Sequence, residues 1–269
     1  PDFEEVKERF FPEALVPYTY RGKCYALPVT QNFNMMFYRT DVFAELGLEP
    51  PQTWEDFYRI APVIQRNNME VGVGDVFTAL LFQRGGDYYT PDLAKTAFDS
   101  KAGMEAFYEW TGFYTRYSFP LSFDLYNRFR TGEMPLGIQA YTFFNMLSAA
   151  APEISGLWEM VPIPGMIDEE GKIVRTQGGS GSAAIILSAA KNKDAAWEFL
   201  KWWTSAEAQA RYGRELETLM GPAARYDTAN VEAFKTLPWS MEQQELLLSQ
   251  WEQVKEIPEI PGSYYVSRG

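Results

Sequence analysis

Hydrophobic positions along this chain follow two patterns, which alternate from one end to the other. Short apolar runs predict strands at residues 24–27, 35–38, 70–74, 134–139 and 183–187. Segments with an apolar residue at every third or fourth position predict helices at residues 2–11, 54–66, 77–82, 100–117, 124–130, 142–149, 193–203 and 242–254. The runs at 134–139 and 183–187 are expected to be buried. Helices that alternate with strands indicate an α/β fold rather than a barrel or a sandwich.

Capping signals define where two of the early helices begin and end. Thr40 or Asp41 begins a short helix, which ends at Gly47 because glycine accepts the left-handed conformation at a helix end. Thr53 caps the next helix, and Pro62 is expected to interrupt it. The region from 40 to 66 is therefore predicted to hold two consecutive helices.

Charge argues against two classes of partner. The 269 residues include 24 Lys and Arg against 36 Asp and Glu, a net charge of −12. Nucleic-acid binding relies on a positively charged face that neutralises phosphates. Docking to an acidic membrane surface likewise relies on clustered Lys and Arg. We therefore expect no nucleic-acid partner and no docking to acidic lipid. No apolar stretch approaches the roughly 20 residues of a membrane span, and no signal segment opens the chain.

Residue usage also argues against common catalytic and metal sites. The sequence contains no histidine, which removes the usual general base and the commonest zinc ligand. Cys24 is the single cysteine, and its apolar surroundings favour a buried small side chain over a nucleophile. No catalytic residue, metal site or cofactor is predicted. Aromatic residues make up 16% of the chain, and beyond filling a core some of these rings could stack on sugars in a cleft.

Several short motifs stand in a fixed order. Gly-Lys-Cys-Tyr-Ala-Leu-Pro spans 22–28, and Asn-Lys-Asp-Ala-Ala-Trp-Glu-Phe-Leu spans 192–200. Between them lie Pro-Gln-Thr-Trp at 51–54, Arg-Phe-Arg-Thr-Gly-Glu at 128–133, Pro-Ile-Pro-Gly at 162–165 and Gly-Gly-Ser-Gly at 178–181. This order resembles the family 1 extracellular solute-binding proteins, the maltose-binding-protein-like substrate receptors of bacterial ABC importers. Arg39 and Thr40 depart from the family's Asn and Lys, at positions expected to lie on the surface.

The resemblance implies an α/β, two-lobed, periplasmic binding protein-like fold with multiple inter-lobe crossings, incomplete in this chain. Residues 1–30 would end the first lobe, and 35–175 would form most of the second. Residues 180–245 would return to the first lobe, and 255–269 would cross back to the second. The chain would then be an internal piece of a longer receptor, whose export signal and first strand–helix units lie outside this sequence.

The resemblance also implies a function without covalent chemistry. Such a receptor captures a small solute, most often a mono- or oligosaccharide, in a cleft between its lobes. It then presents the solute to the transmembrane subunits of an ABC permease. It would act as a monomer outside the cytoplasmic membrane, either in the periplasm or lipid-anchored on the outer face.

Candidate ligand-binding residues follow strand ends and turns. They are Gln31, Asn32, Asp75, Phe77, Tyr141, Gly178, Gly179, Ser180 and Tyr264. Gln31 and Asn32 follow the strand that Pro28 ends, and the alternative is that they are loop amides bonded to nearby backbone. The remaining seven candidates rest on the resemblance. Asp75, Phe77 and Tyr141 match positions at which the family places ligand-facing residues, and the other four lie at its later crossings between the lobes. For Tyr141 the alternative is an aromatic ring of the core.

Residues 178–181 are not expected to form a nucleotide loop of the Walker type, because no Gly-Lys-Ser/Thr ends the segment and a strand is predicted to follow it. Their glycines would instead bring backbone N–H groups close to a ligand.

Two other functions remain open from the sequence. One is a carbohydrate-active enzyme, which would need two carboxylates roughly 5–9 Å apart across a cleft, with Asp75 as one of them. The other is a receptor for a non-sugar solute. A phosphate ligand would need a cationic residue such as Arg84 or Arg175, whereas a polyamine would need several acids with aromatic faces. The sequence does not choose among these ligands.

Overall fold

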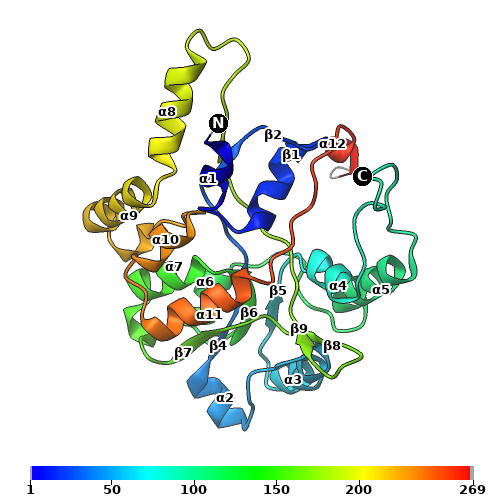
Figure 1. The fold of residues 1–269 in the computed structure, drawn as a ribbon. Coiled ribbons are helices and arrows are strands. Elements are labelled where there is room, and N and C mark those ends of the chain that lie inside the picture. The colour runs from blue at the N-terminus through cyan, green and yellow to red at the C-terminus, as the bar shows by residue number, and fades with distance from the viewer. Residues whose placement is uncertain (1, 267–269) are drawn as a thin grey trace. The chain divides into compact units, whose positions relative to one another are not determined.

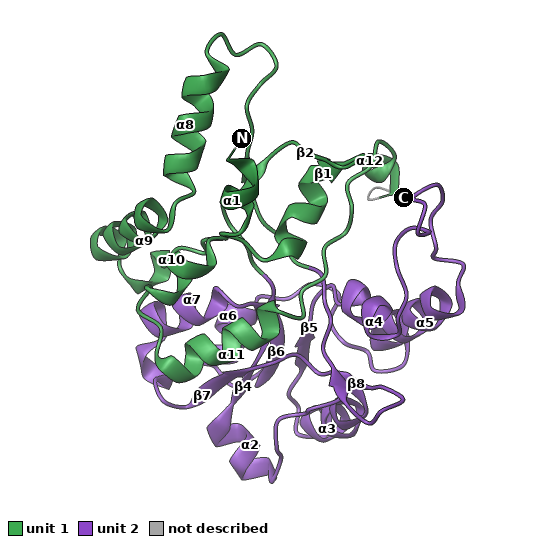
Figure 2. Cartoon of the chain, in the orientation of Figure 1, with its two compact units in different colours: residues 1–32, 179–269 green, residues 33–178 purple. Residues whose placement is uncertain are grey.

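The chain folds into two compact units in a computed structural model that describes residues 2–266 (Figure 2). Unit 1 comprises residues 1–32 and 179–269, and unit 2 comprises residues 33–178. The chain therefore passes into unit 2 between Asn32 and Phe33 and returns between Gly178 and Gly179. Of the segment 255–269, which was expected to cross back to the second lobe, residues 255–266 are grouped with unit 1 and residues 267–269 lie outside the described chain.

Unit 2 is built on a mixed sheet of four strands in the order β5-β6-β4-β7. The strands are β4 (Asn34–Arg39), β5 (Val71–Val73), β6 (Leu136–Ala140) and β7 (Trp158–Val161). β4 pairs antiparallel with both β6 and β7, and β5 pairs parallel with β6. Met35, Met36 and Phe37 of β4 have no exposed surface, so both faces of this central strand are covered. This confirms the apolar strand predicted at 35–38.

Helices, a 3-10 turn and a small hairpin complete unit 2 (Figure 1). They are α2 (Thr40–Leu46), α3 (Trp54–Arg66), α4 (Phe77–Gln83), α5 (Lys101–Thr115), α6 (Leu125–Arg130), α7 (Phe143–Ala150), the 3-10 turn η2 (Pro152–Ile154) and the hairpin β8 (Met166–Ile167) with β9 (Ile173–Val174). Gly47 ends α2 in the left-handed conformation, with φ 64°, as predicted. Thr53 and Asp56 form a capping box at the start of α3, which confirms the predicted cap.

Two expectations about this region are wrong. α3 runs without interruption through Pro62, because the helix buries Phe57, Ile60 and Ile64 on one face and this packing offsets the lost backbone hydrogen bond. Arg39, expected on the surface, is 7% exposed. Its guanidinium bonds both carboxylate oxygens of Asp41, at 2.9 and 2.7 Å, and Nη1 donates to the carbonyls of Phe129 and Arg130 at 2.9 and 3.0 Å. Burial is possible because these four bonds satisfy the charged group.

Unit 1 consists mainly of helices and also contains two small antiparallel pairs of strands (Figure 1). Its elements are α1 (Phe3–Lys7), η1 (Pro12–Tyr18), β1 (Thr19–Tyr20), β2 (Lys23–Cys24), β3 (Leu27–Pro28), β10 (Ala183–Ala184), α8 (Lys193–Trp203), α9 (Ala206–Met220), η3 (Pro222–Ala224), α10 (Val231–Lys235), α11 (Met241–Trp251) and α12 (Ser263–Val266). β1 pairs with β2, and β3 pairs with β10. Across the described residues, no helix combines the length and the hydrophobicity that crossing a bilayer requires.

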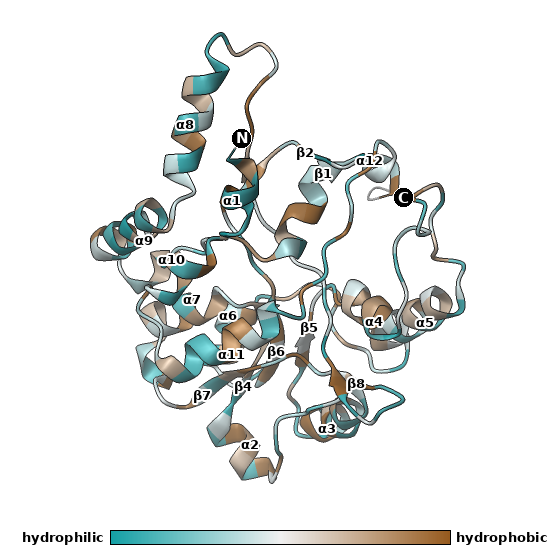
Figure 3. Cartoon of the chain, in the orientation of Figure 1, coloured by the Kyte–Doolittle hydropathy of each residue, from teal (hydrophilic) through white to brown (hydrophobic). Residues whose placement is uncertain are grey.

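The buried strand expected at 183–187 is wrong for most of its length. Pairing with β3 is limited to Ala183 and Ala184, and Ile185 and Leu187 are 58% and 65% exposed. Figure 3 shows this hydrophobic stretch on the path that leads to α8. β3 contributes only two residues to the pairing, Leu27 and Pro28. Within the described chain, residues 185–187 therefore form no further backbone hydrogen bonds of this antiparallel pair.

Candidate functional site

The two segments that connect the units are bonded to each other inside unit 1. The Asn32 N–H donates to the Ser180 carbonyl at 2.6 Å, and the Ser180 N–H donates back at 2.9 Å. The Val29 N–H donates to the Ser182 carbonyl at 2.8 Å. Residues 29–32 and 180–182, far apart in the sequence, therefore run side by side as a short antiparallel pair.

Side chains of this pair divide between two faces, because successive residues of an extended segment point in opposite directions. Thr30 lies with its hydroxyl 2.8 Å from that of Ser182, and Asn32 Nδ2 lies 3.5 Å from Asp227 Oδ2. Gln31, between them, points the other way: it is 3% exposed, and its Nε2 donates to Glu256 Oε1 at 2.6 Å. The structure thus separates Gln31 from Asn32, which the sequence had placed together.

We call the side that carries Asn32 the polar crossing face. It consists of Thr30, Asn32, Ser180, Ser182 and Asp227. Ser180 and Ser182 are exposed, and Thr30, Asn32 and Asp227 are half-buried. The face offers hydroxyl, amide and carboxylate groups together, which can both donate to and accept from the hydroxyls of a polar ligand.

Three members of this face, Thr30, Ser182 and Asp227, are not among the candidates from the sequence, and Asp227 is the charged one. Its carbonyl accepts from the Gln31 N–H at 2.8 Å, which fixes the residue beside the crossing segment. Burial raises the pKa of the Asp227 carboxyl, and the bond from Asn32 acts in the opposite direction. Asp227 lies 195 positions from Asn32, so no local pattern could have linked them.

The glycine pair at 178–179 lies where backbone approaches other groups closely. A Cβ on Gly179 would lie 2.1 Å from Glu256 Oε1 and 2.4 Å from Gln31 Nε2, whereas a Cβ on Gly178 would lie 2.9 Å from Thr78 Cγ2. The absence of a side chain at Gly179 therefore makes room for an internal hydrogen bond of unit 1. Ligand contact by Gly178 and Gly179 stays a prediction.

In unit 2, Asp75 and Phe77 lie at the start of α4. Asp75 is exposed, and its Oδ1 accepts from the Phe77 N–H at 3.2 Å. The half-buried Phe77 ring lies 6.4, 6.0 and 5.9 Å from the ring centroids of Tyr88, Phe98 and Trp110. Trp110 in turn contacts Tyr114 at 5.9 Å. We call these five rings, Phe77, Tyr88, Phe98, Trp110 and Tyr114, the α4–α5 aromatic cluster.

Asp75 acts electrostatically on this cluster. Burial, and then the negative charge of Asp75, raise the pKa of both Tyr88 and Tyr114. A phenol is protonated at neutral pH even at its ordinary pKa, so both side chains can donate hydrogen bonds. Tyr88 already shares one with the Thr78 hydroxyl, at 2.7 Å. An exposed carboxylate beside aromatic rings and phenols is a combination suited to a sugar ring, which presents both C–H faces and hydroxyls.

Two predicted ligand residues differ in exposure. Tyr141 is 1% exposed, and its ring lies 4.9 Å from that of Phe33, which favours the core alternative. Tyr264, in α12, is 58% exposed and packs edge-on against Tyr265 at 5.6 Å. A ligand contact by Tyr264 stays a prediction.

The cationic residues considered for a phosphate ligand are engaged within unit 2. Arg84 pairs with Glu109 and donates to the Leu80 carbonyl at 2.9 Å. Arg175 donates to the Ile163 carbonyl at 3.0 Å and to Gln52 Oε1 at 2.8 Å. These contacts disfavour a phosphate receptor. Within residues 2–266, no group of three or more acidic, cysteine or histidine side chains is arranged to hold a metal ion.

Comparison with known proteins decides the family. The profile of the bacterial extracellular solute-binding proteins matches residues 1–210. The chain belongs to this family. The resemblance seen in the sequence is therefore confirmed. The family consists of binding proteins, which also confirms, at the level of the family, that the protein is not an enzyme.

Curated relatives share a quarter of their residues with this chain over the matched region. The maltotriose-binding protein of Pyrococcus abyssi is 25% identical over 213 residues, which cover 75% of this chain and 45% of the relative. The arabinooligosaccharide-binding protein of Bacillus subtilis is 24% identical over 97 residues, 33% of this chain and 22% of the relative. The chain spans about half the length of the first curated relatives it matches.

Solved structures resemble nearly the whole chain. A solute-binding protein of Thermotoga lettingae bound to α-D-tagatose has a TM-score of 0.76 and 21% identity, and the likeness covers 99% of this chain and 71% of that one. The GacH receptor of Streptomyces glaucescens has a TM-score of 0.73 and 19% identity, over 96% and 67%. At such identities the likeness shows the fold, and it confirms the predicted two-lobed periplasmic binding protein-like class. The partial coverage of those chains is in line with a fold that is incomplete here.

Proposed function

We propose that this chain is the substrate-binding part of a bacterial ABC importer receptor and that it captures a mono- or oligosaccharide. Membership of the solute-binding family supports capture of a small molecule. The printed names of two relatives refer to maltotriose and arabino-oligosaccharides, and one structural neighbour holds tagatose, so sugars are the ligand class that the comparisons favour.

The observation that carries the proposal is the polar crossing face of unit 1. Its amide and carboxylate, Asn32 and Asp227, lie next to the exposed hydroxyls of Ser180 and Ser182. An amide and a carboxylate can each take two hydrogen bonds in one plane, which suits neighbouring hydroxyls of a sugar ring. In unit 2, Asp75 and the α4–α5 aromatic cluster supply the complementary chemistry, a carboxylate beside ring faces.

We further propose that unit 1 belongs to the first lobe of the receptor and unit 2 to the second. The solute would be held in a cleft between the lobes, and the segments at 32–33 and 178–179 would bend when they close. Affinity would then depend on the difference in solute contacts between the open and the closed state. The loaded receptor would act as a monomer outside the cytoplasmic membrane, in the periplasm or lipid-anchored, and deliver the solute to the transmembrane permease subunits.

A thermal-shift screen tests the ligand class. The protein is heated with sugars, polyols, sugar phosphates and amino acids in parallel. A ligand that binds only the folded state at 100 times its Kd stabilises it by about 2.7 kcal/mol, which raises the unfolding midpoint. We expect neutral sugars alone to raise it. A shift with amino acids or sugar phosphates but with no sugar would refute the proposal.

Asn32→Ala provides the matched control for this screen. The variant removes the amide from the polar crossing face, while the backbone bonds to Ser180 remain possible. It should therefore fold with a midpoint near that of the parent and lose most of the sugar-dependent shift. An undiminished shift would show that the sugar binds elsewhere.

A further inference from the structure

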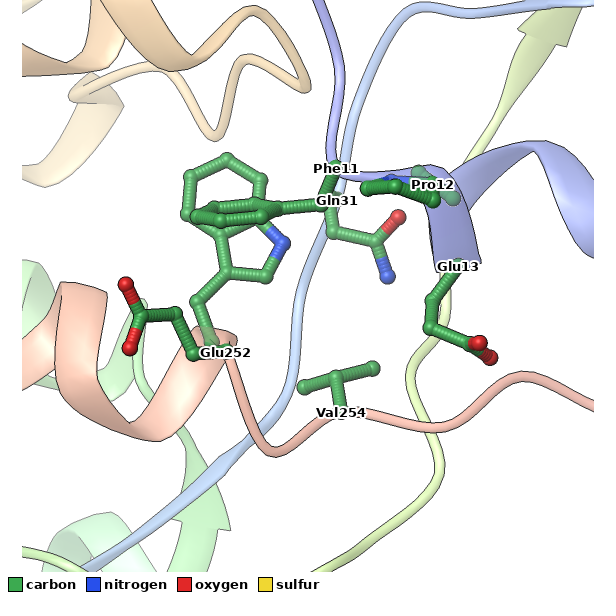
Figure 4. Close-up of a pocket in the computed structure, with 8 residues that line it drawn as sticks. Phe11, Pro12, Glu13, Gln31, Glu252 and Val254 are labelled. Atoms are coloured by element: carbon green, nitrogen blue, oxygen red, sulfur yellow. The ribbon is translucent and has the colours of Figure 1, made fainter.

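A second concave site lies on the other side of the crossing segment, within unit 1. It is a cavity of about 190 Å³, lined by residues of η1, the crossing segment and the end of α11 (Figure 4). Gln31 forms part of its wall, on the side of the chain opposite Asn32 and the polar crossing face. The cavity is therefore distinct from the site proposed for the sugar.

Two aromatic rings form much of the cavity's apolar lining. Phe11 and Trp251 lie 5.0 Å apart between ring centroids, with their planes inclined by 56°. Val254 and Pro12 add further apolar surface. Tilted aromatic rings at the edge of a small cavity present faces of negative potential, and Trp is the best of the side chains for attracting a cation.

The charged residues of the lining are all of one sign. Figure 4 shows Glu13 and Glu252 on opposite sides of the cavity, with Gln31 between them. Neither Lys nor Arg is among the residues that line it. Glu256 lies directly behind Gln31, bonded to its Nε2, and the Glu256 N–H donates to Glu13 Oε2 at 3.0 Å. Two acidic residues thus line the cavity, and a third lies behind Gln31.

The chemistry of the lining discriminates among possible occupants. An anion would face two carboxylates and no cationic side chain, and a metal ion would find no suitable group of three ligands within residues 2–266. A cation with an apolar body can lie against the paired rings, in a lining whose charged side chains are both acidic. The Gln31 side chain adds an amide that can bond a terminal hydroxyl.

We propose that this cavity is a binding site for a small organic cation of the alkylammonium type. Its apolar groups would lie against Phe11 and Trp251, and its charge would be balanced by Glu13 and Glu252. Because Gln31 lines the cavity and directly precedes Asn32, an occupant would touch the unit 1 end of the first crossing segment. The site is independent of the sugar site and does not rest on the proposed function.

Isothermal titration with choline tests the proposal, using 3,3-dimethylbutan-1-ol as the matched neutral probe. The two molecules have nearly the same shape and differ in charge, so their difference isolates the electrostatic part of binding. We expect choline to bind at low salt and to weaken as salt is raised, because exposed Glu252 is screened by ions. The neutral alcohol should bind at least tenfold more weakly, a difference of 1.4 kcal/mol.

Charge-neutral variants locate the site. The double variant Glu13→Gln with Glu252→Gln keeps an acceptor for the Glu256 N–H and should lower the affinity for choline about tenfold. Phe11→Leu should lower it as well, by removing one ring face. Glu259→Gln, an exposed acid of the same C-terminal segment that does not line the cavity, is the control and should leave the affinity unchanged. Absent binding of choline, equal binding of the neutral probe, or equal losses in Glu259→Gln and the double variant would each overturn the proposal.

Discussion

Replacing Gly179 by alanine is expected to destabilise unit 1 through one defined clash. The added Cβ would lie 2.1 Å from Glu256 Oε1, 2.4 Å from Gln31 Nε2 and 2.9 Å from Val254 Cγ1. Gln31 and Glu256 are 3% and 8% exposed and are bonded to each other at 2.6 Å, so neither can move without breaking that bond. The backbone of Gly179 is outside the left-handed region, and alanine can adopt its conformation.

Two contributions determine how much stability Gly179→Ala loses. Forcing an extra methyl group into a packed site costs about 1–3 kcal/mol. Leaving a buried donor or acceptor without its partner costs about 1–3 kcal/mol more, although the two costs overlap because one movement relieves both. Because the two costs overlap, we expect Gly179→Ala to lower the free energy of unfolding by about 2–4 kcal/mol, less than their plain sum.

Urea unfolding followed by circular dichroism measures this loss. Gly262→Ala is the matched control in the same unit, because a Cβ there meets nothing within 4 Å and its φ is not positive. It should change stability by less than about 1 kcal/mol, in the stabilising direction. In a Gln31→Ala background, where Glu256 is free to move, Gly179→Ala should cost at least about 1 kcal/mol less. Equal effects of the two glycine substitutions, or full additivity with Gln31→Ala, would refute the reasoning.

Three further substitutions have outcomes that follow from single contacts. Burial raises the pKa of Glu256 above its ordinary value of 4.5, so ionisation of this group penalises the folded state as pH rises above 4.5. The stability of Glu256→Gln relative to the parent should therefore increase as pH rises from 4.5, and a pH-independent difference in urea unfolding would contradict this. In Arg39→Lys, the lysine ammonium cannot bond both carboxylate oxygens of Asp41 and also reach the two backbone carbonyls. Thermal unfolding should therefore show a free energy of unfolding lower by about 2–4 kcal/mol. Stability equal to that of the parent would exclude a stabilising role for the forked bond. Thr53→Ala should cost about 1 kcal/mol in urea unfolding by removing the capping box, whereas Thr53→Ser should cost little; equal losses would point to packing instead.

Elements with strong local signals could be predicted from the sequence. The helix expected at 193–203 is α8 with the same bounds, because an Asn192 cap and a periodic apolar pattern define it locally. The Gly47 helix end and the Thr53 cap are equally local. The conformation at Pro62 and the burial of Arg39 depend on tertiary packing. Burial of the apolar face of α3 keeps the helix continuous through Pro62. A backbone carbonyl 90 residues away accepts a hydrogen bond from the Arg39 guanidinium. Such distant compensation leaves no trace in a short stretch of sequence.

Some features of the candidate site could likewise be predicted from the sequence, whereas others depend on tertiary contacts. The sequence predicts a strand that ends at Pro28 and polar side chains after it, but the direction in which Gln31 and Asn32 point depends on the pairing with residues 180–182. The role of Asp227 depends on a contact across 195 positions. Sequence reasoning could place polar groups near the crossings, whereas the division into a polar face and a cavity required the three-dimensional structure.

Sugar affinity measured by titration calorimetry on three proteins tests the central claim most directly. The parent is compared with Asn32→Ala, on the polar crossing face of unit 1, and with Phe77→Ala, in the aromatic cluster of unit 2. The account predicts that a neutral sugar from the thermal screen binds the parent and that each variant weakens it at least tenfold, about 1.4 kcal/mol. A sugar that binds all three proteins with equal affinity would contradict the account.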